Sequence, residues 1–244
     1  MTGHYCLQLD VGNSSAKWRL VNNAEVLARG VYVPDDTSSL EAMLGCAEQV
    51  QQVWIASVAG DQREGELATV LEQRWGVSPW FARTQANTGD LVNSYSDPGR
   101  MGVDRWLAML GARHRYRERL CVVDAGSAVT IDLVAEDGRH EGGYIIPGPT
   151  LMERALLLDT DRVRFAEAVE YDLPPGRSTA EAVRHGVALA EAGAVNLAME
   201  QAGEPAPRLV LCGGAAPTMQ QLLNGRGEWL PDLVFEGLQI MAGQ

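Results

Sequence analysis

The sequence predicts an α/β protein made of two related halves, each a mixed sheet flanked by helices, with a ligand cleft between the halves. Two observations predict this fold. A short pattern occurs twice, in which an apolar segment leads into an aspartate, a glycine and a hydroxyl residue, first at Asp10 and again at Asp124. In the first half, the segments follow the order β-β-β-α-β-α-β, which is typical of a mixed sheet. The expected halves are residues 1–115 and 116–244, joined near residues 112–120.

The elements of the first half follow from apolar runs and from the turn residues between them. Ser38 or Ser39 is the expected cap of the first helix. Residues 87–101 form a polar stretch rich in Gly, Asn, Asp and Pro, and we expect a long functional loop there. The expected strands are residues 5–9, 16–20, 26–33, 53–58 and 77–81, and the expected helices are residues 39–50, 64–74 and 102–119.

The second half opens at Leu120 with the same kind of apolar run. A Gly-Gly pair, Gly213-Gly214, ends its last predicted strand, and a helix follows. Such a strand-Gly-Gly-helix junction suits a base or ribose lying flat against backbone, although Gly-Gly often only makes a turn. The expected strands are residues 120–124, 128–134, 140–146 and 209–212, and the expected helices are residues 150–158, 178–200 and 217–223.

The composition is that of a globular protein, with 46% hydrophobic and 21% charged residues among 244. No apolar run reaches the roughly 18 residues of a membrane helix, and the first residues lack the pattern of a signal peptide, so we expect a cytoplasmic protein. The net charge of −12 argues against nucleic acid or an anionic membrane as the main partner. Cys6, Cys121 and Cys212 lie in or beside apolar runs and are expected to be buried.

The first repeated turn, from Asp10 to Lys17, places a glycine-rich hairpin between two strands. Backbone N–H groups in such a turn point at an anion, and Gly12 removes the side chain that would block it. Asp10 is a candidate ligand of Mg²⁺, directly or through water. Lys17 is the only lysine of the chain and stands where a phosphate site would need a cation. The alternative is an ordinary Gly-Asn hairpin turn.

The second turn, at Asp124 and Ser127, repeats this chemistry. Ser127 can donate to a phosphate oxygen, and Asp124 can bind a cation. Thr130 and Asp132 alternate along the following strand and share one face, where hydrogen bonding within the strand is the alternative to a role in binding. Two matched turns are a much rarer coincidence than either alone.

The third group of candidates begins the helix after the long loop, at Gly102-Val-Asp104-Arg105. An aspartate near a helix start is often only a first-turn charge. The adjacent arginine favours a second interpretation, in which Asp104 takes a proton and Arg105 binds an anionic substrate group. The glycine-rich segment from Gly142 to Gly148 is a further candidate wall of a pocket.

The order of these motifs resembles the type III pantothenate kinases, which belong to the superfamily of acetate and sugar kinases, heat-shock chaperones and actin. The resemblance spans nearly the whole chain, although Ser14 and Ser127 stand where the family more often has threonine; serine keeps the hydroxyl. The segments that carry it are Asp10-Val-Gly-Asn-Ser with Lys17, Tyr95 with Asp97-Pro98, Gly102-Val-Asp104-Arg105, Asp124-Ala-Gly-Ser-Ala-Val-Thr130, Gly142-Gly-Tyr-Ile-Ile-Pro-Gly148, and Thr179 after Arg177-Ser178.

The resemblance implies two ribonuclease H-like halves, ATP-dependent phosphorylation of pantothenate to 4′-phosphopantothenate, and a homodimer. It implies that Asp104 accepts the proton and that Asp124 binds a monovalent cation such as K⁺ or NH₄⁺. The implied ATP contacts are Asp10, Val11, Gly12, Asn13, Ser14, Ser15, Ala16, Lys17 and Ser127. The implied pantothenate contacts are Tyr95, Gly102, Val103, Asp104, Arg105 and Thr179.

Three other functions stay open at this point. A nucleotide-binding structural module is one, but it leaves the segment Gly102-Val-Asp104-Arg105 unexplained. The first enzymatic alternative is a different small-molecule kinase of the same superfamily, acting on a sugar or a carboxylate, which a substrate panel would distinguish. The second alternative is a non-catalytic regulatory or accessory protein on the same scaffold. The intact aspartates Asp10, Asp104 and Asp124 argue against that second alternative. The negative net charge also argues against direct contact with DNA.

Overall fold

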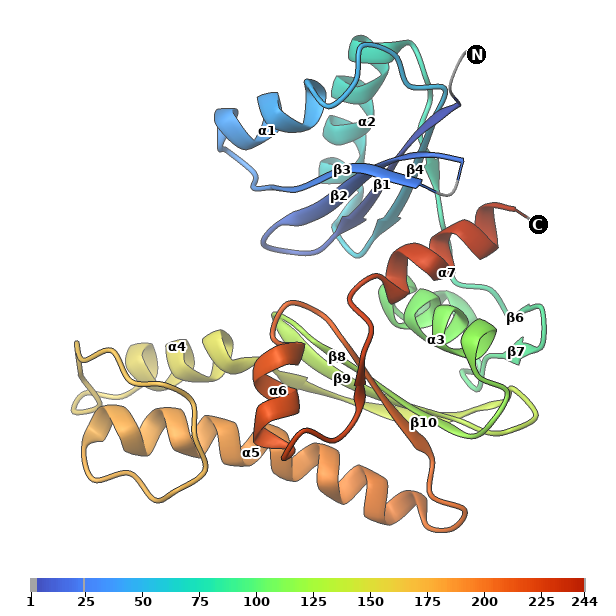
Figure 1. Ribbon diagram of the computed structural model, residues 1–244. Coiled ribbons are helices and arrows are strands. Elements are labelled where there is room, and N and C mark those ends of the chain that lie inside the picture. The colour runs from blue at the N-terminus through green and yellow to red at the C-terminus, as the bar shows by residue number, and fades with distance from the viewer. Residues whose placement is uncertain (1–3, 24, 244) are drawn as a thin grey trace. The chain divides into compact units, whose positions relative to one another are not determined.

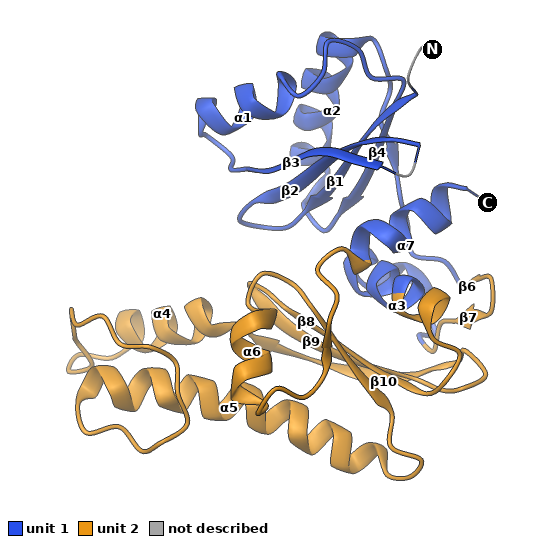
Figure 2. Ribbon diagram, viewed as in Figure 1, with its two compact units in different colours: residues 1–86, 95–111, 234–244 blue, residues 87–94, 112–233 orange. Residues whose placement is uncertain are grey.

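The computed structural model describes residues 4–23 and 25–243. The chain divides into two compact units, which Figure 2 shows in different colours. Unit 1 contains residues 1–86, 95–111 and 234–244, and unit 2 contains residues 87–94 and 112–233. This division differs from the halves expected from the sequence in three places, because the end of the chain belongs to unit 1, whereas a short piece of the long loop and residues 112–115 belong to unit 2.

The sheet of unit 1 has five strands in the order β3-β2-β1-β4-β5. The first three strands form an antiparallel meander, and β4 and β5 add to it in parallel. The mixed sheet is therefore confirmed. The strands are β1 (Tyr5–Val11), β2 (Ala16–Asn22), β3 (Glu25–Tyr32), β4 (Gln52–Ser57) and β5 (Trp80–Phe81).

Two helices, α1 (Thr37–Leu44) and α2 (Asp61–Trp75), lie together on one side of this sheet (Figure 1). Their buried side chains, Met43, Leu67 and Leu71, pack with the apolar side chains of β1, β2 and β4 into one core. The other helices that begin or lie in this unit are α3 (Val103–Arg115), whose end continues into unit 2, α7 (Leu233–Ala242) and a short 3₁₀ helix, η1 (Pro98–Arg100).

The expected first helix, at residues 39–50 with a serine cap, was wrong at both ends. Asp36 is the cap, because its carboxylate accepts from the Ser38 backbone N–H at 3.1 Å. The helix ends at Leu44, before Gly45. The helix predicted at 102–119 also ends earlier, at Arg115.

The sheet of unit 2 repeats the topology of unit 1, with the order β10-β9-β8-β11-β12. Strands β8, β9 and β10 form an antiparallel meander, and β11 and β12 add to it in parallel. The equivalent strands β1 and β8 are those that carry Asp10 and Asp124. The strands are β8 (Leu120–Ala125), β9 (Ala128–Val134), β10 (His140–Pro147), β11 (Arg208–Cys212) and β12 (Glu228–Trp229).

Helices α5 (Thr179–Ala202) and α6 (Ala216–Leu222) cover one face of this second sheet. Ala188, Ala192 and Val195 of α5 pack on Val123 and Ile131 of the sheet. Helix α4 (Pro149–Asp159) follows β10 and contacts α5. Cys6, Cys121 and Cys212 are buried, as predicted.

The polar stretch at 87–101 is more ordered than predicted. It contains a small hairpin of β6 (Asn87–Thr88) and β7 (Leu91–Val92), followed by η1. Asp90, in the turn of this hairpin, forms an ion pair with Arg113, and Asp90 Oδ2 lies 3.1 Å from Arg113 Nη2. Among the residues that the structure describes, no helix has the length and apolar character needed to cross a membrane.

Candidate functional site

The first predicted phosphate turn joins β1 to β2 in unit 1. Asp10 lies opposite Lys17 in the register of the two strands, and Val11 lies opposite Ala16. The Gly12 backbone N–H donates to the Ser15 carbonyl at 3.0 Å, which closes a tight turn with Asn13 exposed at its tip. The hairpin therefore presents its backbone at the end of the sheet, as an anion site requires.

The side chains of this hairpin divide between the two faces of the sheet. Leu7, Leu9 and Val11 face α1 and α2, so Asp10 lies on the opposite face, because successive side chains alternate. Arg19 is on the same face as Asp10 and Lys17 by this alternation, and its guanidinium lies 4.6 Å from the ring centre of Phe235 in α7. The charged members of the predicted ATP site thus share the face that α7 borders.

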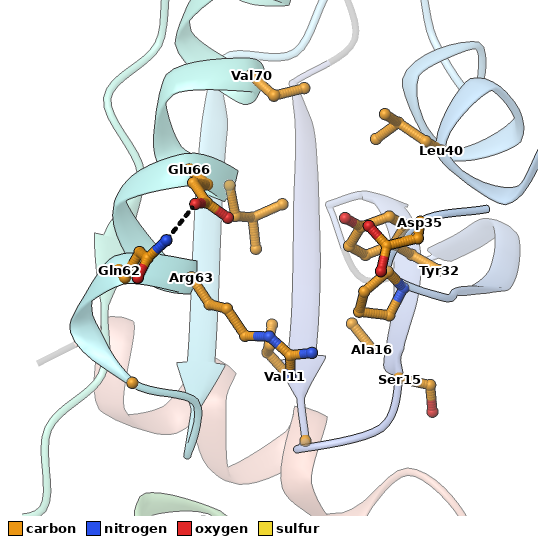
Figure 3. A pocket seen from close by; sticks show the side chains of 14 residues that line it. Val11, Ser15, Ala16, Tyr32, Asp35, Leu40, Gln62, Arg63, Glu66 and Val70 are labelled. Atoms are coloured by element: carbon orange, nitrogen blue, oxygen red, sulfur yellow. Dashed lines mark hydrogen bonds between the residues drawn. The ribbon is translucent and has the colours of Figure 1, made fainter. Parts of the chain in front are cut away.

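Behind the turn, on the side of α1 and α2, lies a hollow of about 550 Å³ (Figure 3). Arg63 of α2 extends into it, and its Nη1 atom donates to the Asn13 carbonyl at 2.6 Å. The next residue, Glu64, is hydrogen-bonded by Arg83, which lowers the pKa of the Glu64 carboxyl. The Arg63 contact ties the start of α2 to the turn, and Arg63 is a neighbour of the turn that the sequence did not point to.

The predicted substrate residues Tyr95, Asp104 and Arg105 come together in unit 1. Arg105 is 4% exposed, and its Nη1 atom donates to the Tyr95 hydroxyl at 3.0 Å. The Arg105 backbone N–H donates to Asp104 Oδ1 at 2.8 Å. A buried guanidinium, a phenol and a half-buried carboxylate make a site suited to an anionic substrate that also carries a hydroxyl.

Gly102 makes room for the Asp104 carboxylate. A Cβ atom at Gly102 would lie 2.5 Å from Asp104 Oδ1 and 3.8 Å from Val58 Cγ1. The Val58 N–H donates to the Val11 carbonyl at 3.0 Å, so Gly102 and the first turn lie at the same end of the unit 1 sheet. The Thr84 hydroxyl donates a hydrogen bond to the carbonyl of Met101, the residue before Gly102, at 2.9 Å.

The second turn, between β8 and β9, brings three glycine motifs of unit 2 together. The Gly148 N–H donates to the Ser127 carbonyl at 2.9 Å, and the Ala215 N–H donates to the Ala125 carbonyl at 2.8 Å. A Cβ atom on Gly148 would lie 2.2 Å from the Gly126 carbonyl oxygen. The turn, the end of β10 and the junction after β11 are therefore packed backbone against backbone.

Gly213 brings the Gly-Gly junction against Asp124. Gly213 has a φ of +89°, and a Cβ atom there would lie 2.3 Å from both the Ala125 carbonyl oxygen and Asp124 Oδ1. The half-buried Asp124 thus stands between the turn that carries Ser127, which is exposed, and the junction predicted to hold adenosine. Thr130, opposite Asp124 in the register, lies on the same face.

Thr179 is the first residue of α5, beside its cap Ser178, and is exposed. It belongs to unit 2, whereas Tyr95 and Gly102 to Arg105 belong to unit 1. Its contact with substrate stays a prediction.

The five-stranded topology that both units repeat is a fold that this chain shares with solved structures of low sequence identity. A Campylobacter jejuni protein assigned to the Baf family of transcriptional activators has a TM-score of 0.62 at 21% identity, with 97% of each chain covered. The activator of 2-hydroxyisocaproyl-CoA dehydratase from Clostridium difficile has a TM-score of 0.53 at 13% identity, covering 98% of this chain and 95% of that chain.

The sequence comparisons then define the family. A profile of the type III pantothenate kinase family matches residues 6–201. The type III pantothenate kinase of Ectopseudomonas mendocina is 39% identical, over 96% of this chain and 97% of that protein. That of Hahella chejuensis is 35% identical, over 97% of this chain and 96% of that protein. The chain belongs to the type III pantothenate kinases, and the resemblance seen in the motifs is confirmed.

Proposed function

We propose that this chain transfers the γ-phosphoryl group of ATP to the primary hydroxyl of pantothenate, giving 4′-phosphopantothenate and ADP, the first step toward coenzyme A. Membership of the family supports the activity. The single structural observation that supports it best is the grouping of Tyr95, Asp104 and Arg105. Pantothenate carries a carboxylate and a primary alcohol, and this grouping offers a cation for the first and a base for the second.

In this proposal Asp104 is the proton acceptor. The substrate O–H bond breaks toward its carboxylate while the alcohol oxygen bonds to the γ-phosphorus and the bond from phosphorus to the leaving ADP oxygen breaks. Arg105 binds the anionic end of pantothenate, and Tyr95 holds the guanidinium in place through its hydroxyl. Gly102 keeps open the space that the carboxylate occupies.

The proposed ATP contacts are residues 10–17 and Ser127, as the family resemblance implies. Asp10 and Asp124 each place one carboxylate beside turn backbone, and hard cations prefer such oxygen ligands. Among the residues that the structure describes, no group of three or more His, Cys, Asp or Glu side chains is placed to hold a metal ion. Mg²⁺ at Asp10 and K⁺ or NH₄⁺ at Asp124 would supply charge that offsets the phosphates.

The role of Asp124 is testable by itself. Asp124→Ala is expected to abolish activation by K⁺ or NH₄⁺, because the carboxylate that holds the cation beside the phosphates is gone. Initial rates are measured against KCl and NH₄Cl at constant ionic strength. A variant that K⁺ activates as much as it activates the parent would contradict this role.

We also propose a homodimer, in the cytoplasm. Unit 2 exposes five large apolar side chains close together in sequence, Tyr144 and Ile145 on β10 and Leu151, Leu156 and Leu158 on α4. We call these five residues the β10–α4 set. Exposed large apolar side chains of this kind are typical of an interface, and the family resemblance favours a second copy of this chain as the partner.

The experiment that tests the activity is phosphopantothenate formation by mass spectrometry, together with ADP release. Pantothenate is expected to drive ADP release, whereas a panel of sugars and short carboxylic acids is not. Release that depends on one of those compounds instead would favour the other small-molecule kinase. If none of the compounds tested causes the purified chain to release ADP, the non-catalytic alternative would be favoured.

A further inference from the structure

Three side chains that the proposed reaction does not use form a hydrogen-bonded series in unit 2. His140 Nε2 lies 2.9 Å from Asp132 Oδ1, and His140 Nδ1 lies 2.8 Å from Ser94 Oγ. His140 is fully buried and Asp132 is 2% exposed, whereas Ser94 is exposed. Buried polar groups in such a series specify one arrangement, because each hydrogen bond lost inside the protein is costly.

Asp132 decides the direction of the hydrogen bonds. A carboxylate oxygen accepts, so Nε2 of His140 is the donor to Asp132 Oδ1. With the ring neutral, Nδ1 accepts and the Ser94 hydroxyl donates to it. Ser94 is therefore held by an oriented ring that is itself held by β9, rather than by an adaptable surface contact.

Ser94 lies at the point where the chain leaves unit 2. Residues 87–94 belong to unit 2, and residues 95–111 belong to unit 1. Tyr95, the next residue, contacts Arg105, both through its hydroxyl and through its ring, whose centre is 5.8 Å from the guanidinium carbon. One peptide bond thus separates a side chain fixed to the unit 2 sheet from a side chain fixed to the proposed pantothenate site.

We infer that Ser94, His140 and Asp132 are positioning residues that fix the backbone at Tyr95 and thereby set the affinity for pantothenate. The inference rests on the proposed function, because it needs Tyr95 and Arg105 to bind pantothenate. Loss of the Ser94 hydroxyl frees the start of the substrate loop, and part of the binding free energy is then spent on ordering it. The turns proposed to bind ATP have no part in this contact, so the ATP constants do not change.

The test compares Ser94→Ala with Ser96→Ala, a matched change at an exposed serine two residues along the same loop. Ser94→Ala is expected to raise the KM for pantothenate about five- to tenfold, which is what one lost hydrogen bond accounts for. The kcat and the KM for ATP are expected to stay within about twofold. Ser94→Thr keeps the hydroxyl and is expected to restore the KM for pantothenate.

A double-mutant cycle separates positioning from a general loss of structure. Asp132→Asn is expected to raise the KM for pantothenate in the parent, and to have no further effect in the Ser94→Ala background, because both changes break the same series. Equal effects in both backgrounds would mean that Asp132 acts only through stability, and would overturn the inference. The Ser94 variants alone decide it if the Asp132 variants do not fold.

The two failures are distinguishable. A parent enzyme that does not phosphorylate pantothenate overturns the proposed function, and this inference with it. A parent that does so, with Ser94→Ala behaving like Ser96→Ala, overturns the inference alone.

Discussion

At the scale of single residues, the candidate site depends as much on missing side chains as on present ones. Gly102, Gly148 and Gly213 each lie where a Cβ atom would meet a carboxylate or carbonyl oxygen at 2.5 Å or less. At Gly148 and Gly213 separate motifs touch one another. The charged residues Asp104 and Asp124 lie beside two of these three glycines, so geometry and chemistry are fixed by the same contacts.

Asp104→Asn is expected to lower kcat by about 10²- to 10⁴-fold, the usual contribution of a general base. Asparagine keeps the shape of the side chain, and its amide oxygen can still accept from the Arg105 backbone, but it cannot take the proton. Pantothenate binding, measured by calorimetric titration, is expected to stay within a few-fold of the parent. Turnover within a few-fold of the parent would instead make Asp104 a first-turn charge of α3.

Gly213→Ala is expected to weaken ATP binding and to lower the free energy of unfolding by about 2 kcal/mol or more, because both φ strain and backbone collision oppose it. Gly214→Ala is the matched control, since a Cβ atom there meets nothing within 4 Å. Its unfolding free energy is expected to stay within about 0.5 kcal/mol of the parent. Urea unfolding and ATP titration measure both, and equal effects of the two changes would contradict the packing of this junction.

At the scale of elements, the sequence predicted the long strands well and the ends of helices poorly. The strands β1, β2, β8, β9 and β11 are apolar runs between turn residues, and sheet pairing confirms them. The first helix was misplaced because Asp36, Ser38 and Ser39 are all good caps, and only the fold decides among them.

Helix α7 was not predicted at all. Its sequence, Leu233–Ala242, is apolar on most sides and contains Gly237, which by propensity disfavours a helix. The reason for Gly237 lies in tertiary structure, because a Cβ atom there would lie 2.1 Å from the Leu107 carbonyl oxygen in α3. The repeated aspartates were visible as local patterns, whereas Ser94, His140 and Asp132 come from distant segments that share no motif.

Helix α5 buries a single acidic side chain among its described residues, that of Glu191. Glu191 is 5% exposed within an otherwise apolar face, and no hydrogen-bond partner of its Oε1 atom is found among the described residues. Burial raises the pKa of the Glu191 carboxyl from 4.5 to about 7. The folded protein therefore favours the protonated form, and α5 is expected to be least stable where this group is charged.

The sign of the pH dependence follows from that shift. The folded pKa lies above the unfolded value, so the stability is fully present below about pH 4.5 and is lost as the pH rises through about 7. Glu191→Gln is expected to raise the free energy of unfolding by roughly 1–3 kcal/mol at pH 8 and to change it little at pH 5. Glu200→Gln, at an exposed position of the same helix, is the control. Urea unfolding at both pH values measures the difference, and a gain at pH 5 as large as at pH 8 would contradict the titration.

At the scale of the whole molecule, the chain is one topology used twice and then specialised. In unit 1 the repeat carries Asp10 with Lys17 in register, and in unit 2 it carries Asp124 with Thr130. The first turn is contacted by Arg63 of α2, whereas Gly148 and Gly213 pack against the backbone of the second turn. Each copy therefore contributes a different part of the proposed reaction.

The two copies of the topology differ in the helix that follows their third strand, and this difference bears on assembly. Strand β3 of unit 1 leads into α1, which is packed on its own sheet through Met43. The equivalent strand β10 leads into α4, for which no buried residue is found, and the β10–α4 set stays exposed. Ile145 and Leu158 are the most exposed members, at 62% and 65%. Apolar area of this kind is stabilised when a partner removes it from water, at about 25 cal/mol per Å².

A second copy of the chain is the partner that we predict. Ile145→Asp and Leu158→Asp are each expected to shift the protein from twice the chain mass of 26.4 kDa to that mass, because a charge buried in an apolar interface is costly. Leu27→Asp, at a 46% exposed leucine of unit 1, is the control and is expected to stay dimeric. Sedimentation velocity over a range of concentrations measures all four proteins. A monomeric parent would contradict the dimer, and a dimer that survives both charges would place its interface away from the β10–α4 set.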